Sequence, residues 1–157
     1  MLRTFFEWMG NTSFSQGILN SVYQSAAYNL VHLLSMVIFA GAILVVDLRL
    51  LGKGLTTQPI AQVARAAQPW LIGGFLGLLL TGIPAVMSTA FRLYETPLFW
   101  IKMYILLAGL IFTVTIRRKV TLAEEGRVRP VWSKLVGVTS ILIWMLVAAS
   151  ARMIMLY

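Results

Sequence analysis

Four long apolar segments alternate with shorter polar stretches along the chain. They lie at about residues 27–48, 69–90, 97–116 and 135–156. A helix that crosses the hydrocarbon core of a membrane needs about 20 mostly apolar residues, and each segment reaches that length. The connections are too short for a separate soluble domain. The pattern therefore predicts an all-α integral membrane four-helix bundle, with residues 1–157 forming a single domain.

The residues before the first span show a different pattern. The apolar positions that recur there at helical spacing are Leu2, Phe5, Phe6 and Met9. Arg3 and Glu7 fall on the opposite face, and no apolar run has the length that a secretory signal requires. We expect a short amphipathic helix that lies in the membrane interface.

Composition supports a membrane protein and limits the chemistry. Hydrophobic residues make up 59% of the chain and charged residues only 11%, too few to cover the surface of a soluble domain. The chain has no cysteine, which excludes disulfides, thiolate metal sites and cysteine nucleophiles. The excess of 13 Lys+Arg over 5 Asp+Glu lies near the ends of the spans, so we expect no nucleic-acid partner.

The basic residues predict how the chain is oriented. Those between the first and second spans and between the third and fourth are Arg49, Lys53, Arg65, Arg117, Arg118, Lys119, Arg127, Arg129 and Lys134. Loops rich in Lys and Arg stay in the cytoplasm. Both termini are then expected on the periplasmic side of a bacterial inner membrane.

This orientation brings five side chains to one depth in the outer half of the bundle. They are His32, which is the only histidine, with Met87, Lys102, Met103 and Arg152. Polar side chains and thioethers from different helices at one level are typical of a ligand site in a bundle. Each also has a simpler explanation, because Lys and Arg can snorkel, Met can pack, and His32 can bond to a carbonyl group.

Asp47 lies at the cytoplasmic end of the first span, where the helix dipole is negative and a carboxylate needs a cationic neighbour. Arg49, Arg65, Arg117 and Arg118 are all near enough in the topology to provide one. We interpret Asp47 and Arg49 as a structural ion pair that joins the first span to the cytoplasmic loops.

Small residues indicate how the second span packs, and prolines indicate where the second and third spans begin. Gly73, Gly77 and Thr81 recur at four-residue intervals, a pattern that admits either another helix or a flat ligand. Pro69 and Pro97 are expected at the first helical positions of the second and third spans.

The sequence contains no recognisable catalytic constellation. Gly-rich phosphate loops, Ser-His-Asp sets and metal-protease motifs are missing. The single aspartate and the single histidine lie at opposite ends of one span, which excludes a triad and a pair of histidine ligands from one chain. An enzyme with its own turnover is therefore the least expected class.

The run Asp-Leu-Arg-Leu-Leu-Gly at residues 47–52, preceded by His32 and Gly41, carries a resemblance. The chain resembles a family of small bacterial four-span membrane proteins of unknown function with this motif. The similarity continues through Pro69-Trp70, Thr81-Gly82, Phe99 with Lys102, Ala108-Gly109, and Trp144 with Arg152 and Tyr157. At Ala151 the family more often has glycine. The layout is more distantly similar to copper-resistance membrane proteins and cytochrome b561-like bundles.

Three functions fit the predicted outer layer. The first is binding of haem b or a similar anionic cofactor, for electron transfer or sensing. His32 would be an axial ligand, Lys102 and Arg152 would pair with propionates, and the face of Gly73 and Gly77 would admit the ring.

The second function is copper binding or transport on the periplasmic side, through His32 with Met87, Met103 or Met153. Lys102 and Arg152 at the same level would repel a cation.

The third function is that of a non-catalytic accessory or oligomer-forming membrane subunit, without a cofactor, whose polar layer binds lipid or quinone.

Overall fold

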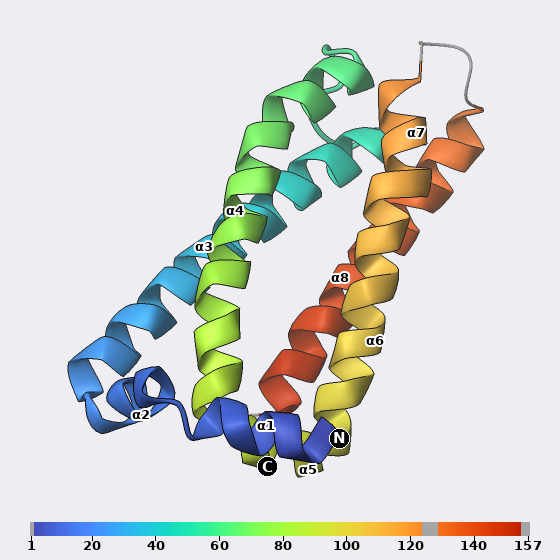
Figure 1. Cartoon of the computed structure of the whole chain (residues 1–157). Helices are drawn as coiled ribbons and strands as arrows, with labels where there is room; N and C mark the ends of the chain where they lie inside the picture. The colour runs from blue at the N-terminus through green and yellow to red at the C-terminus, as the bar shows by residue number, and fades with distance from the viewer. Residues whose placement is uncertain (1, 124–128, 155–157) are drawn as a thin grey trace.

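The computed structural model describes residues 2–123 and 129–154 and is predominantly helical over these ranges (Figure 1). Four helical stretches are long and apolar enough to cross a membrane: Val22–Leu50, Ile60–Ser88, Pro97–Leu122 and Pro130–Ile154. The prediction of an all-α bundle with four spans is thereby confirmed. The predicted end of the fourth span at residue 156, together with Arg127 and Tyr157, lies outside the described residues.

The first two spans extend further than predicted at their polar ends. Helix α3 (Val22–Leu50) begins after Ser21, whose hydroxyl accepts a hydrogen bond from the Gln24 amide at 3.4 Å and caps the helix. Helix α4 (Ile60–Ser88) begins nine residues before Pro69. The extra residues include several alanines and glutamines. Both types have a high helix propensity, although glutamine is polar.

The expectation for Pro69 is therefore wrong, whereas that for Pro97 is confirmed. Pro69 lies inside α4, where its missing N–H leaves the Arg65 carbonyl without its usual helical donor. Pro97 begins α6 (Pro97–Phe112). Span three continues through a π-helical turn, η1 (Thr113–Arg117), into α7 (Arg118–Leu122).

The long helices form two pairs. The most extensive contact joins α3 to α4, and α6 packs mainly on α8 (Pro130–Ile154). The pairs meet through α3 with α8 and α4 with α7, but α6 makes no extended contact with α3 or α4 over the described residues. We call the end where α3 stops and α4 and α8 start the loop end, and the opposite end the α5 end, after α5 (Ala90–Glu95).

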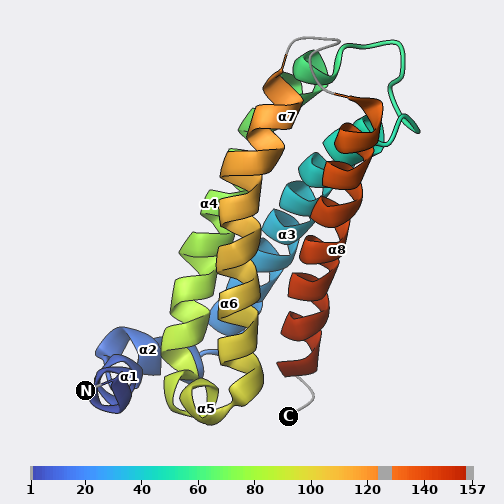
Figure 2. The same cartoon turned by 90° about the vertical axis from the view of Figure 1, so that its right-hand side faces the viewer.

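Two short helices lie beside the α5 end of the bundle, as Figure 2 shows. Helix α1 (Leu2–Gly10) is the expected amphipathic helix, with Arg3 and Glu7 paired at 3.0 Å on its exposed side. Its Phe6 is buried in a cluster with Ala90 and Phe99. Helix α2 (Ser13–Asn20), which the sequence did not predict, follows it.

The interior is small, and most large apolar side chains face outward. One core cluster lies between α3 and α4, formed by Ala42, Val46, Val63 and Ala67. Another lies at the loop end, formed by Leu50, Val120 and Val136. Side chains such as Leu80, which is 72% exposed, would meet lipid in a membrane.

Candidate functional site

The histidine of α3 is bonded to α4 by a short hydrogen bond. His32 Nδ1 lies 2.7 Å from Thr81 Oγ1, and that oxygen lies 2.7 Å from the Gly77 carbonyl oxygen. A hydroxyl has one proton, and a carbonyl can only accept, so the Thr81 proton goes to Gly77. His32 Nδ1–H then donates to Thr81. In the neutral imidazole this arrangement leaves the lone pair on Nε2.

A cation from the third span lies near this ring. Lys102 of α6 is half-buried and close enough to His32 to act on it electrostatically. On the α4 side the ring lies beside Gly82, where an added Cβ would stand 3.6 Å from His32 Cε1. The structure therefore brings together two members of the predicted outer layer, His32 and Lys102, from different helices.

The other three members of that layer have different surroundings. Met103 is 42% exposed, because a helical step of about 100° turns it away from the direction of Lys102. Met87 is half-buried on α4, and its carbonyl accepts a hydrogen bond from the fully buried Ser15 at 2.9 Å. Arg152 is exposed in the last turn of α8.

Two glycines of α4, Gly74 and Gly77, lie where this helix packs closely on α3. A Cβ at Gly77 would stand 2.9 Å from Ser35 Cβ, and one at Gly74 would stand 2.7 Å from the Phe39 backbone nitrogen. Gly73 has no atom within 4 Å of that position. Gly73 and Gly77 therefore do not share one open face, because Gly77 is packed against α3, and cofactor binding beside Gly73 stays a prediction.

The physical reason is the helical period. Four-residue steps drift by about 40° per step around a helix of 3.6 residues per turn, so a strict four-residue stripe leaves the interface. The contact follows Gly74, Gly77 and Thr81 instead, at spacings of three and four residues.

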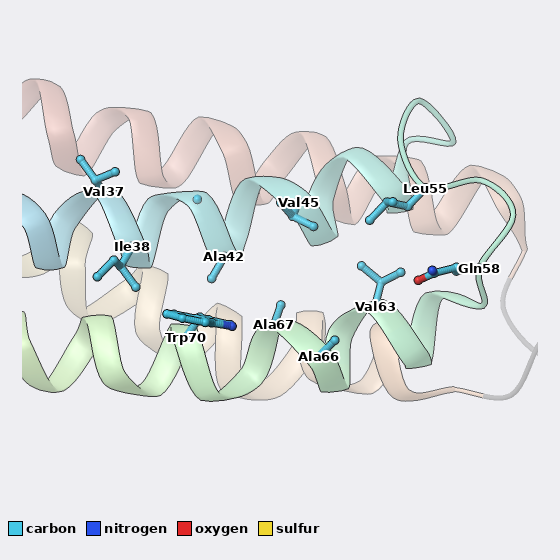
Figure 3. Close-up of a pocket in the computed structure, with 11 residues that line it drawn as sticks. Val37, Ile38, Ala42, Val45, Leu55, Gln58, Val63, Ala66, Ala67 and Trp70 are labelled. Atoms are coloured by element: carbon cyan, nitrogen blue, oxygen red, sulfur yellow. The ribbon is translucent and has the colours of Figure 1, made fainter.

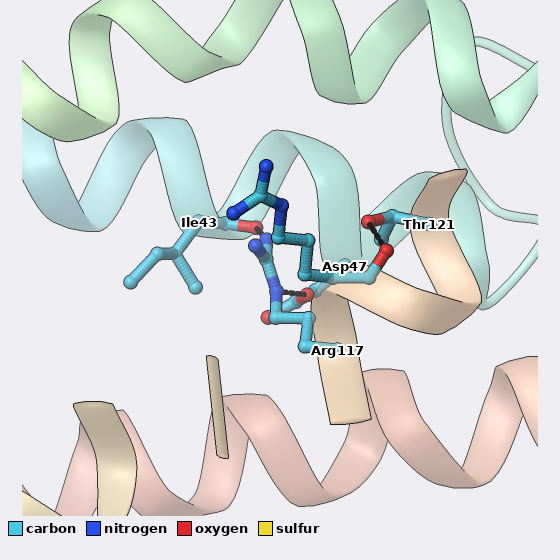
Figure 4. Close-up of polar contacts among 5 residues, drawn as sticks. Ile43, Asp47, Arg117 and Thr121 are labelled. Carbon is cyan, nitrogen blue, oxygen red and sulfur yellow. Dashed lines mark hydrogen bonds and ion pairs between the residues drawn. The ribbon is translucent and has the colours of Figure 1, made fainter. Parts of the chain in front are cut away.

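At the loop end, Asp47 is fully buried and pairs with Arg117 of η1 (Figure 4). Arg117 Nε donates to Asp47 Oδ1 at 2.9 Å, and its terminal nitrogen donates to the Ile43 carbonyl at 3.1 Å. The expected pair of Asp47 with Arg49 is corrected by this geometry. Two residues along a helix correspond to about 200°, so the two side chains leave opposite sides of α3.

Arg49 does join α3 to the following loop, but without a carboxylate. Its Nε donates to the Gln58 carbonyl at 2.6 Å. Of the four arginines that the sequence offered as neighbours of Asp47, the structure selects Arg117, from the third span. The π-helical turn that carries it has no evident signal in the sequence, and such turns often occur at functional sites.

Several buried polar side-chain atoms lie in the interior near this ion pair and further along the bundle. Those without a hydrogen bond of good geometry, over the described residues, are Asp47 Oδ2, Thr113 Oγ1, Ser140 Oγ and Trp144 Nε1. Ser140 is a neighbour of the carboxylate, and Gly137 of α8 lets the helices approach, since an added Cβ would lie 3.2 Å from the Asp47 carbonyl oxygen. The loop-end half therefore has a polar interior.

The sequence did not predict the hydrogen bond between His32 and Thr81. With the predicted span boundaries, His32 lies about a turn closer to the membrane surface than Thr81. From the observed helix ends, Val22 and Ser88, the offset is about as large in the other direction, so helix ends alone do not place the two residues at one level. The packing of α3 on α4 brings them together. Over the described part of the chain there is no group of three or more His, Cys, Asp or Glu side chains that could hold a metal.

A comparison with protein-family models matches residues 5–157 to DUF6644, a family of unknown function. The chain belongs to this family. Membership in DUF6644 covers nearly the whole length and agrees with the resemblance to a family without an established activity. No curated protein and no solved structure matches the chain. The function of this DUF6644 protein must therefore be argued from its own residues.

Proposed function

We propose that this DUF6644 protein holds a b-type haem, or a similar anionic cofactor, in the half of the membrane bundle near α5, for electron transfer or sensing. The observation that carries the proposal is the hydrogen bonding of His32. A histidine that ligates a metal usually donates its other ring N–H to a fixed acceptor, which sets the tautomer and the ring orientation. Thr81 provides that acceptor at 2.7 Å, which leaves Nε2 for iron.

The position of Lys102 supports an anionic ligand. A lysine near His32, on the helix across from the α3–α4 pair, is suited to a carboxylate such as a haem propionate. In this proposal the planar group lies between α6 and that pair, which make no extended contact with each other over the described residues. The tightly packed face of Gly77 is not available to it. Arg152 remains the proposed second partner for a propionate.

His32 would hold the iron through a single side chain, and an iron with an open position could bind a small molecule, which suits sensing. Met87 and Met103 were the candidates for a second ligand. Met103 is exposed, and Met87 lies on the same helix as Thr81, so neither is favoured by the geometry.

Copper binding is the weaker alternative for the same reasons. Cu(I) would need His32 together with thioethers, but Met103 is exposed and Lys102 places a positive charge near the ring. An accessory subunit that binds lipid or quinone without a cofactor is the alternative that a colourless, metal-free protein would favour.

The proposal is tested by measuring the haem and copper content of the purified protein. We expect close to one haem per chain in the wild type and less than about a tenth of that in His32→Ala. Met103→Leu is the matched control, because Met103 is exposed on α6, and it should keep its haem. Equal haem content in His32→Ala and wild type would contradict the proposal, and copper lost only from His32→Ala would favour the second candidate.

A further inference from the structure

A groove of about 350 Å³ runs along the outside of the α3–α4 pair toward the loop end (Figure 3). Val37, Gly41 and Val45 line it from α3, and Ala66 and Trp70 line it from α4. Its lining is almost entirely apolar, with Gln58 at its loop end. The groove is separate from the His32 site, which lies further toward the α5 end.

Small side chains keep this groove open. Gly41 has no atom of the described residues within 4 Å of the position that a Cβ would take, so the space beside it is open. Figure 3 shows the flat indole of Trp70 between the two helices, and this side chain is 64% exposed. An apolar chain lying against Gly41 and Trp70 would bury surface that the protein leaves uncovered.

The loop end of the groove carries positive charge. Arg49 follows Val45, the last groove residue on α3, by one four-residue step, which is a rotation of only about 40°, so Arg49 lies just beyond the loop end of the groove. Its Nε is held by the Gln58 carbonyl at 2.6 Å, and Gln58 itself lines the groove. The guanidinium is therefore fixed at the mouth of the groove.

This charge has no acidic partner over the described residues. The two ion pairs there join Arg3 to Glu7 and Asp47 to Arg117, and neither includes Arg49. Lys53 and Arg65 are exposed in the adjoining loop and the first turns of α4. The loop end of the groove thus has one guanidinium that is held by the Gln58 carbonyl and has no acidic partner among the described residues.

We propose that the groove binds an anionic phospholipid, with one acyl chain along Gly41 and Trp70 and the phosphate held by Arg49. The twelve residue-to-residue steps from Val37 to Arg49 span about 18 Å along α3, close to the thickness of about 15 Å of one leaflet's hydrocarbon. A second copy of the chain is a poorer occupant. Closed symmetry would bring the basic residues of both copies into one interface.

The experiment is native mass spectrometry of the protein in mild detergent, mixed with equal amounts of phosphatidylglycerol and phosphatidylethanolamine that carry identical acyl chains. Each basic residue near a membrane surface favours anionic lipid about fivefold. We expect wild type to bind phosphatidylglycerol at least fivefold better. Arg49→Gln should bring the ratio close to one, whereas Arg49→Lys should keep most of it.

Two further variants test the acyl-chain part of the site. Gly41→Leu fills the groove and should lower the binding of both lipids several-fold. Ala40→Leu is its matched control, because Ala40 is the exposed neighbour on α3 and does not line the groove. Lys134→Gln removes an exposed charge from α8 at the same end of the bundle and should leave the lipid ratio unchanged.

Three outcomes would overturn the proposal. One is equal binding of the two lipids by wild type, and another is an equal effect of Lys134→Gln and Arg49→Gln. The third is a wild-type dimer that Gly41→Leu dissociates without a change in lipid binding, which would make the groove an interface between two copies.

Discussion

His32 and Asp47 lie on the same helix, and each is bonded to a residue from another helix. His32 donates to a hydroxyl on α4, whereas Asp47 accepts from a guanidinium in η1. A buried polar group in a membrane requires such partners, because no water is present in the hydrocarbon core to replace them. The two hydrogen bonds differ in whether they leave an atom that a ligand could use. Arg117 neutralises Asp47, but Thr81 leaves His32 Nε2 available.

The role of Thr81 is tested by Thr81→Val, which keeps the shape of the side chain and removes the acceptor. Loss of a hydrogen-bond partner behind a metal ligand typically costs 10- to 100-fold in affinity, so we expect the dissociation constant for haem to rise by about that factor. Titration of the haem-free protein measures it. Thr115→Val is the control, because Thr115 is exposed and bonds only to Ile111 of its own helix. An unchanged constant in Thr81→Val would argue against a ligand role for His32.

The buried ion pair makes a separate prediction about stability. Removing one partner leaves the other charge uncompensated, so Asp47→Leu should lower the free energy of unfolding by about 3–5 kcal/mol. Replacing both residues, as in Asp47→Leu with Arg117→Met, should recover most of that loss. Arg3→Gln breaks the exposed pair of α1 and should cost less than about 1 kcal/mol. Unfolding in detergent–SDS mixtures provides the measurement, and a double variant no more stable than Asp47→Leu would contradict this reading.

At the scale of elements, the close approach of α3 to α4 positions both the histidine site and the lipid groove. Gly74 meets the backbone of Phe39, and Gly77 meets Ser35, one turn from the bond between His32 and Thr81. Small residues at such a crossing let two membrane helices pack at short distance. The hydrogen bond at Thr81 therefore depends on glycines that lie outside it.

Two neighbouring glycines separate the effect of packing from that of helix propensity. Gly74→Ala places a methyl group 2.7 Å from the Phe39 nitrogen, so the helices must move apart, and we expect a loss of about 1–3 kcal/mol. Gly73→Ala meets nothing within 4 Å and should be neutral or slightly stabilising. Thermal unfolding of the two variants measures the difference. Equal melting temperatures would show that α3 and α4 are not tightly packed there.

The elements could be predicted from the sequence better than the contacts between them. Four apolar runs are sufficient to locate four spans, because length and hydropathy decide whether a helix can cross a membrane. The ends were placed less well, since polar residues before Pro69 also form helix. The π-helical turn and the partner of Asp47 depend on packing between distant segments, which no local pattern contains. The position of Arg49 opposite Asp47 could have been obtained from helical geometry alone.

At the scale of the whole molecule, the two helix pairs are joined at both ends. The ion pair of Asp47 and Arg117 joins α3 to span three at the loop end, and α1 packs across the α5 end through Phe6. Between these ends the pairs meet through α3 and α8, where the rings of Phe39 and Trp144 lie 4.7 Å apart. Helix α6 makes no extended contact with α3 or α4 over the described residues.

The orientation expected from the basic loops places the α5 end on the periplasmic side. The chain has no cysteine, so single cysteines report without background. We expect Ser13→Cys, exposed at the start of α2, to react with a membrane-impermeant maleimide added to intact cells. Thr57→Cys, exposed in the loop between α3 and α4, should react only after the membrane is opened. The reverse pattern would contradict the predicted orientation and move the His32 site to the cytoplasmic half.

The most direct test of the proposed function is the absorption spectrum of the protein, purified from its native membrane in mild detergent, oxidised and then reduced with dithionite. The account predicts a Soret band that shifts on reduction and that His32→Ala abolishes, because His32 Nε2 would be the axial ligand to iron. A wild-type spectrum without a Soret band, unchanged after haem is supplied, would contradict it.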